Sequence, residues 1–178
     1  MRIVIVCLAA VGACTSAATT ADPSAPSVQT IRSEGMGSLR VVGTTDASST
    51  AFNAAAEDAF QFLPLVYDSL AIPRTWIEPK QFLISSQGFK VRTRLGRTSL
   101  SRYIDCGSTQ IGANADSYEV FMTVTSRLVP NGKDRSTLSS TVEASARPLS
   151  FNQDYSRCSS RGELERRIAQ VAKGFVTH

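Results

Sequence analysis

The chain has 178 residues, of which 42% are hydrophobic and 19% charged, and its formal net charge is +4. This length suits one domain with a real core, and the mild positive charge permits attraction to anionic partners without demanding one. Its single histidine, His178, ends the chain, which argues against acid–base catalysis near neutral pH, so we expect no enzyme.

The first residues, MRIVIVCLAAVGAC, have the pattern of an export signal. An early positive charge precedes a short apolar run, and small residues follow before Cys14. The apolar run is too short to remain as a membrane span. We therefore predict a signal peptide over residues 1–13.

The order Val11-Gly12-Ala13-Cys14 resembles the lipobox of bacterial lipoproteins. The resemblance implies that Cys14 becomes the acylated N-terminus and anchors the protein to a membrane of the bacterial cell envelope. Thr15, which is not Asp, implies sorting to the outer membrane, with the domain facing the periplasm. The alternative is ordinary secretion, with cleavage after Ala13 or near Ala21 and an unmodified Cys14.

Residues 14–30 are rich in Ser, Thr, Ala and Pro and nearly uncharged. Such a composition buries too little apolar surface to offset the entropy of ordering, so it predicts a flexible tether. Residues 31–178 are then expected to form a single α+β domain. Nucleic acid is not an expected partner, because export separates the protein from it.

Cys106 and Cys158 remain once Cys7 leaves with the signal and Cys14 is acylated. An even remainder in an exported domain favours a disulfide between them. The alternative is two unpaired buried thiols. Neither cysteine has another Cys or a His at ligand spacing, so no metal and no cofactor is expected.

The first predicted elements are a strand at 38–43 and a long helix over residues 52–70, preceded by N-cap hydroxyls at 47–50. The helix prediction rests on an apolar stripe with steps of three and four: Phe52, Ala56, Ala59, Leu63, Val66 and Leu70. Pro64 predicts a kink in this helix, or a later start near Asp58, and Pro73 ends it.

Alternating or extended patterns predict the strands of the domain, at 74–78, 81–86, 89–95, 118–127 and 136–147. Turns are expected at Pro79-Lys80, at Gly88 and at 130–133, while residues 99–107 are ambiguous between a short helix and a strand. In the last strand we expect Leu138, Val142, Ala144 and Ala146 to face the core.

Ser160 and Glu163 fit a capping box, which predicts a closing helix. Its buried stripe is expected to be Leu164, Ile168, Val171 and Phe175, and its solvent-facing side Glu165, Arg166, Arg167 and Lys173.

Together these elements predict an α+β fold, a two-layer sandwich in which two main helices pack on one face of an antiparallel sheet. Their order is similar to the helix-grip folds of envelope lipoproteins such as BamC, of the outer-membrane β-barrel assembly machinery. The resemblance lies in the order of elements only, so it implies no residue roles.

Five cations, Lys90, Arg92, Arg94, Arg97 and Arg102, are the candidate anion-binding residues. The first three are expected to share one face of a strand, and a guanidinium fork suits phosphate or carboxylate groups. A merely solvated strand face is the alternative. The short string Tyr103–Ser108 also faintly resembles an aspartic-protease signature around Asp105, but a Cys stands where that signature has a hydroxyl.

The expected function is a non-enzymatic binding or assembly role in the cell envelope, with an envelope protein or an anionic glycan or lipid as candidate partner. The alternative is a secreted domain that binds a small apolar or anionic ligand in a pocket between helix and sheet.

Overall fold

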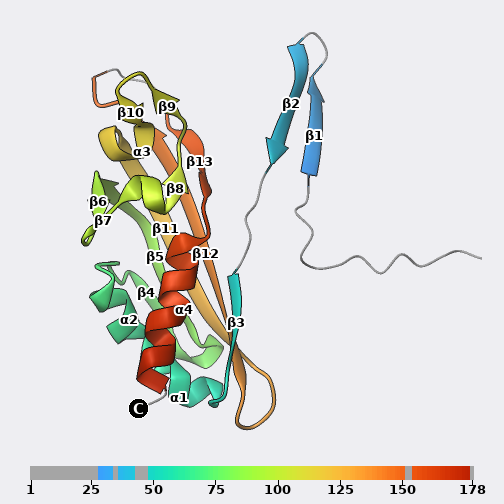
Figure 1. Ribbon diagram of the computed structural model, residues 1–178. Helices are drawn as coiled ribbons and strands as arrows, with labels where there is room; N and C mark the ends of the chain where they lie inside the picture. Colours follow the sequence, from blue (N-terminus) through green and yellow to red (C-terminus); the bar gives the residue numbers. More distant parts are fainter. Residues whose placement is uncertain (1–27, 34–35, 43–47, 151–153, 177–178) are drawn as a thin grey trace, which may run out of the picture.

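The computed structural model describes residues 28–33, 36–42, 48–150 and 154–176, with side chains described from residue 48 onward. The predicted signal peptide and Cys14 lie outside these residues. The described chain is mixed α+β, with a mostly antiparallel sheet and a few helices (Figure 1). The α+β class expected from the sequence is confirmed.

The N-terminal elements are two strands, β1 (Val28–Ser33) and β2 (Met36–Val42), which pair with each other in antiparallel fashion. The strand predicted at 38–43 therefore falls on β2. Strand β1 begins at Val28, so residues 28–30 of the range predicted as a tether are extended, and the rest of that range lies outside the described residues.

The main sheet is built from antiparallel pairs throughout. Its strands are β3 (Ser48–Phe52), β4 (Trp76–Glu78), β5 (Leu83–Arg92), β8 (Ile104–Asp105), β11 (Glu119–Pro130), β12 (Ser136–Arg147) and β13 (Ser156–Ser160). The spatial order is β4-β5-β11-β12-β13-β8, and β3 pairs with residues 136–140 of β12, along the same edge that β13 occupies at residues 144–146. The strands predicted on either side of the turns at Pro79-Lys80 and 130–133 pair as the antiparallel hairpins β4–β5 and β11–β12, which confirms both turns as chain reversals.

The central hairpin, β11–β12, has one face packed against the core and one face that is more exposed to solvent. Along β12, burial alternates residue by residue, and Leu138, Val142, Ala144 and Ala146 are buried as expected. Because side chains alternate across a strand, the intervening residues face the other side of the sheet.

The helices that contribute to the core are α1 (Ala56–Phe60), α2 (Leu63–Ser69) and α4 (Glu163–Val176), and α4 runs in front of the central strands (Figure 1). Their apolar residues join those of β11 and β12 in one core. The shorter elements are η1 (Pro79–Gln81), β6 (Arg94–Leu95), β7 (Thr98–Ser99), η2 (Leu100–Arg102), β9 (Ser108–Thr109), β10 (Gly112–Ala113) and α3 (Asn114–Ser117).

The long helix predicted over residues 52–70 is wrong in its extent. Residues 48–52 form β3 instead of helix caps, because this segment pairs with the stretch of β12 that β13 does not reach. Helix α1 then ends at Phe60 and α2 begins at Leu63, with Pro64 in its first turn, where the missing N–H costs nothing.

The turn predicted at Gly88 is wrong, because Gly88 lies within β5 and the chain does not reverse there. The register with β11 shifts between Met122 and Val124, and the Gly88 N–H donates to Thr123 Oγ1 at 3.1 Å. Gly88 has φ +59°, and a Cβ there would lie 2.7 Å from the ring of Phe121. A glycine therefore permits a β-bulge at this point, with an aromatic ring lying over it.

The start of α4 also differs from the predicted capping box. Ser160 Oγ accepts the Gly162 N–H, but its hydroxyl donates to Glu165, at 2.6 Å, and Glu163 pairs with Arg166 instead. Glu165 is only 1% exposed, so its predicted place on the solvent-facing side is wrong. Of the predicted stripe, Leu164 and Ile168 are buried, whereas Val171 and Phe175 are half-buried.

The predicted disulfide is confirmed: the Sγ atoms of Cys106 and Cys158 are 2.06 Å apart. Cys158 lies on β13, and Cys106 directly follows β8, so the bond ties two neighbouring strands at the edge of the sheet.

Candidate functional site

The five predicted anion-binding cations do not form one group. Lys90 and Arg92 lie on β5, but the strand ends at Arg92, and Thr93, with φ +61°, turns the chain into β6. Arg94 therefore leaves the shared strand face, Arg97 lies between β6 and β7, and Arg102 ends η2. The structure brings together Lys90 and Arg92, and adds partners that the sequence reasoning missed.

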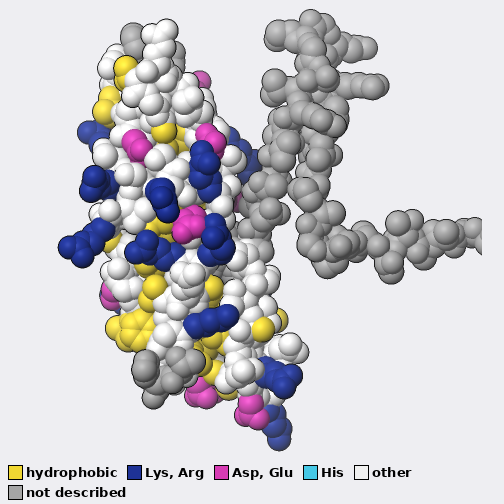
Figure 2. Space-filling model, viewed as in Figure 1, with side chains coloured by type: hydrophobic (Ala, Val, Ile, Leu, Met, Phe, Trp, Pro, Cys, Tyr) yellow, Lys and Arg dark blue, Asp and Glu magenta, His cyan; other side chains and the backbone are white. Residues whose placement is uncertain are grey.

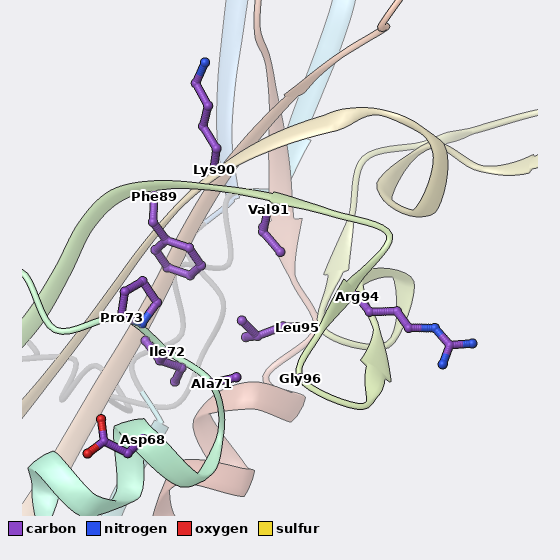
Figure 3. A pocket seen from close by; sticks show the side chains of 10 residues that line it. All are labelled: Asp68, Ala71, Ile72, Pro73, Phe89, Lys90, Val91, Arg94, Leu95 and Gly96. Carbon is purple, nitrogen blue, oxygen red and sulfur yellow. The ribbon is translucent and has the colours of Figure 1, made fainter.

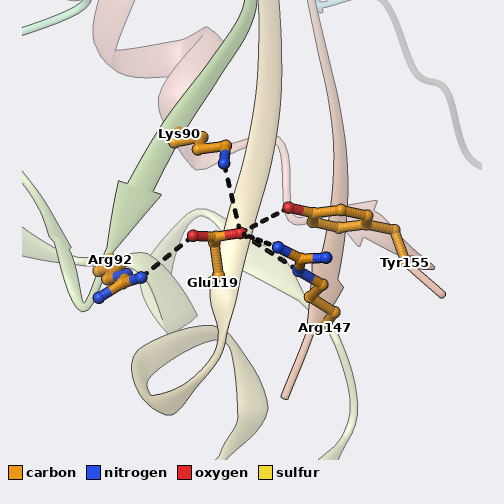
Figure 4. A network of polar contacts seen from close by, with 5 residues as sticks. All are labelled: Lys90, Arg92, Glu119, Arg147 and Tyr155. Atoms are coloured by element: carbon orange, nitrogen blue, oxygen red, sulfur yellow. Dashed lines mark hydrogen bonds and ion pairs between the residues drawn. The ribbon is translucent and has the colours of Figure 1, made fainter. Parts of the chain in front are cut away.

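Those partners form a cluster around Glu119 (Figure 4). The carboxylate accepts from Arg92 Nη2 at 3.1 Å, Arg147 Nη2 at 3.0 Å and the Tyr155 hydroxyl at 2.7 Å, and Lys90 Nζ lies 3.7 Å away. Glu119 has a side chain only 9% exposed, whereas those of Lys90 and Arg92 are 60% and 61% exposed. We call these five residues the Glu119 cluster.

Strand register places this cluster. Glu119 is directly opposite Arg92 on β5 and directly opposite Arg147 on β12, while Lys90 is opposite the next residue on that face, Phe121. Directly opposed side chains on one face of a sheet are within contact distance. The observed register has Pro130 opposite Ser136, whereas counting back from the predicted turn at 130–133 would place Ala144 opposite Glu119, so the sequence did not indicate Arg147. Tyr155 comes from outside the sheet, and no sequence signal indicated it.

The electrostatics of the cluster keep the carboxylate charged. Hydrogen bonds from Tyr155 and Arg92, then that of Arg147 and the charge of Lys90, lower the pKa of Glu119 to about 2. The same hydrogen bond to Glu119 raises the pKa of Tyr155, which stays a neutral donor. Three cations thus share one carboxylate, and the surface above it keeps an excess of positive charge.

Aromatic rings border this surface. The ring of Tyr155 lies 6.0 Å from that of Phe121, and the guanidinium of Arg147 lies 4.7 Å from the Tyr155 ring centroid. Phe121 is 39% exposed. Stacking on an aromatic face holds a guanidinium in one orientation. The cluster is therefore a preformed cationic surface with apolar rings beside it.

A pocket of about 520 Å³ lies elsewhere, between the α2–β4 connection and the start of β6 (Figure 3). Phe89 and Val91 point into it from the face of β5 opposite Lys90, and Ile72 and Leu95 complete its apolar lining. The charged groups of Asp68, Lys90 and Arg94 point outward, so the interior is apolar and the mouth is polar.

A second hollow, of about 550 Å³, is lined by Phe62, Val171, Gly174 and Phe175 near the C-terminal end of α4. The rings of Phe62 and Phe175 are stacked, with centroids 6.0 Å apart. Figure 2 shows Lys and Arg side chains gathered higher on this face, over the middle of the molecule. A separate contact joins α4 to β7, since Arg167 donates to the Thr98 hydroxyl at 3.4 Å.

Asp105, the centre of the protease-like string, has structural partners. Its carboxylate accepts from Arg161 at 2.8 Å and from the Gly107 N–H at 2.9 Å, and the neighbouring Cys106 is in the disulfide. Among the described residues, no three His, Cys, Asp or Glu side chains are grouped so as to hold a metal ion. The helices of the described part include none that is both long and apolar enough to span a membrane.

No protein-family model matches this chain, and a search of the curated proteins finds no significant match.

Proposed function

We propose that this protein is a lipid-anchored component of the bacterial cell envelope and that it works by binding. The lipobox at Cys14 and the Ser- and Pro-rich residues behind it support an anchored domain held away from the membrane surface. The Cys106–Cys158 disulfide supports an oxidising compartment. The finer architecture that we propose is a two-layer sandwich, with helices on one face of the sheet and the opposite face free for a partner.

The binding surface that we propose is the Glu119 cluster, and the partner is a phosphate- or carboxylate-bearing lipid or glycan of the envelope. The observation that carries this proposal is the convergence of three cations on one nearly buried carboxylate. Glu119 holds the cations at fixed spacing and leaves positive charge in excess, so an incoming anion meets donors that are already oriented.

Binding suits this cluster better than catalysis does. General acid–base work needs a group whose pKa lies near the working pH. Glu119, with a pKa of about 2, and Tyr155, with a raised pKa, both lie far from neutral. Their protonation states therefore stay constant, which favours a surface that recognises charge.

The test compares two double variants of equal charge. Lys90→Gln/Arg92→Gln removes two exposed cations of the cluster but leaves Arg147 and Tyr155 on Glu119. Lys133→Gln/Arg135→Gln removes two exposed cations from the β11–β12 turn. Binding is measured by co-sedimentation with phosphatidylglycerol vesicles, with phosphatidylcholine vesicles as the neutral control, and with purified peptidoglycan.

We expect the cluster variant to bind the anionic surface about tenfold more weakly or worse, since each cation near such a surface contributes about 1 kcal/mol. Binding should also weaken with added salt. Comparing binding to the vesicles with binding to peptidoglycan shows whether the partner is a lipid or a glycan. Equal loss in both variants would indicate only a response to net charge, and would contradict a specific surface.

The anchor is tested separately, by fractionation of cells that express the native protein or Cys14→Ser. We expect the native protein in the outer-membrane fraction, with an intact mass that includes acyl chains, and the variant in the soluble periplasmic fraction. An intact mass with Met1 present and no acyl group would contradict the anchor.

A further inference from the structure

The apolar pocket beside α2 plays no part in anion binding at the Glu119 cluster. Its lining residues Ile72 and Leu95 are 2% and 4% exposed, and Phe89 and Val91 form half-buried walls that point inward (Figure 3). The pocket is an open groove, and its volume of about 520 Å³ lies within the usual range of small-molecule sites. The core is thus filled beneath the pocket, and the pocket itself has room for an apolar ligand.

The backbone around this pocket is held in uncommon conformations. Ala71 has φ +57° and Thr93 has φ +61°, and the second is a β-branched residue, for which such a value is rare. Gly96, with φ +56°, lies close to Ala71, so that a Cβ at Gly96 would be 3.5 Å from the Ala71 Cβ. Strained backbone of this kind persists where the surrounding structure holds a site in shape. Ala71 and Gly96 line the pocket, and Thr93 directly precedes Arg94, which also lines it.

The charges at the mouth favour one negative group on the ligand. Asp68 is already paired with Arg74 at 3.0 Å, and Lys90 lies beside Glu119. Arg94 makes no ion pair with any described residue, and its guanidinium points outward at the rim (Figure 3). Its stem can stay against apolar surface while the head meets an anion in water.

We propose that this pocket binds a single-chain fatty carboxylate, with the hydrocarbon tail against Phe89, Val91 and Leu95 and the carboxylate at Arg94. Burial of the tail supplies most of the affinity, because an ion pair at an exposed rim contributes little. The pocket shares Lys90 with the Glu119 cluster, but the variants that test the pocket leave Lys90 unchanged, so this inference stands or falls independently of the proposed function.

The first experiment titrates the full chain with dodecanoate by isothermal calorimetry. We expect saturable binding at one site. Val91→Trp fills the pocket and should weaken binding about tenfold or more, a loss of about 1.4 kcal/mol or more. The matched control is Val129→Trp, at an exposed position near the far end of β11, which should bind as the native chain does.

The second comparison tests the head group. Arg94→Gln should weaken dodecanoate binding about two- to fivefold, as expected for an exposed ion pair, and should leave the binding of dodecanol unchanged. Equal effects on the acid and the alcohol would overturn the role assigned to Arg94.

A third measurement needs no variant and covers the case in which Val91→Trp does not fold. A dodecanoate analogue with a photoreactive diazirine on its tail is cross-linked to the native chain, and the adducts are mapped by mass spectrometry. Adducts within residues 71–73 or 89–96 support the pocket. Adducts at Phe62 or Phe175, an absence of saturable binding, or full affinity in a folded Val91→Trp chain would each overturn the proposal.

Discussion

Two buried carboxylates of this domain have opposite surroundings. Glu119 lies beneath three cations and accepts a tyrosine hydroxyl, so its charged form is stabilised. Glu165 accepts a hydrogen bond from Ser160, but its Oε2 atom is buried without a partner. Burial raises the pKa of Glu165, whereas hydrogen bonds and nearby cations lower that of Glu119. The same residue type therefore stabilises the fold at one position and penalises it at the other.

For Glu119 we predict a specific loss of stability in acid. Its pKa falls from 4.5 in the unfolded chain to about 2 in the fold, so its contribution is complete above about pH 4.5 and is lost as the pH falls towards 2. The free energy of unfolding, measured by urea titration across this range, should therefore decrease less steeply in Glu119→Gln than in the native chain. Glu143→Gln, at an exposed position on the adjacent strand, should keep the native slope. Parallel slopes in all three proteins would contradict the role of Glu119.

Helix α4 shows how a tertiary neighbour changes a local motif. Sequence spacing indicated that Glu163 would close the capping box, but the hydroxyl of Ser160 donates to Glu165. The reason is that α4 rests on β12 with Glu165 turned to the interior, while Glu163 stays near the surface and pairs with Arg166. Spacing alone places both residues near the helix start and does not say which one the sheet covers.

The buried Glu165 predicts a pH dependence of the opposite sign. Its pKa in the fold is raised above 4.5, so the folded chain binds its proton more tightly, and stability falls as the pH rises from about 4.5 through the raised pKa. Relative to the native chain, Glu165→Gln should therefore gain stability as the pH rises through this window. Thermal unfolding at a series of pH values measures the difference, and Glu163→Gln, two residues earlier on the same helix, is the matched control. A difference that does not change with pH would contradict this interpretation.

The segment 52–70, predicted as one long helix, also shows how tertiary neighbours decide secondary structure, because it forms the end of β3 followed by two short helices. Its apolar stripe is real, since Ala56, Ala59, Leu63 and Val66 are all buried. Phe52 is buried as well, but from a strand, because the open edge of β12 offers a hydrogen-bond ladder to residues 48–52. Periodicity thus identified core residues correctly, while strand pairing between distant segments decided the type of element.

At the scale of the whole molecule, the disulfide closes a loop between residues 106 and 158. Restricting a loop of this length in the unfolded chain contributes about 4 kcal/mol in the entropy model. We predict that Cys106→Ser/Cys158→Ser lowers the free energy of unfolding by about that amount, and that reducing agent destabilises the native chain but not the variant. Chemical denaturation with and without reductant measures both. An unchanged midpoint in the native chain under full reduction would contradict the prediction.

The amino-acid sequence by itself determined the α+β class, the two confirmed hairpins, the alternation along β12 and the disulfide partners. Each of these four features depends on a local sequence pattern or on a simple count of residues. Predicting them therefore needs no knowledge of which residues are neighbours in the fold. It also indicated that Lys90 and Arg92 share a strand face, because side chains alternate along one strand.

Only the tertiary structure decided what surrounds those residues. Register across three strands placed Glu119 between Arg92 and Arg147, and a segment before β13 added Tyr155. The turn at Thr93 sent Arg94 to the mouth of an apolar pocket instead of to the cluster. These arrangements join residues that are far apart in the chain, and local patterns carry no information about which distant strands pair or where each strand ends.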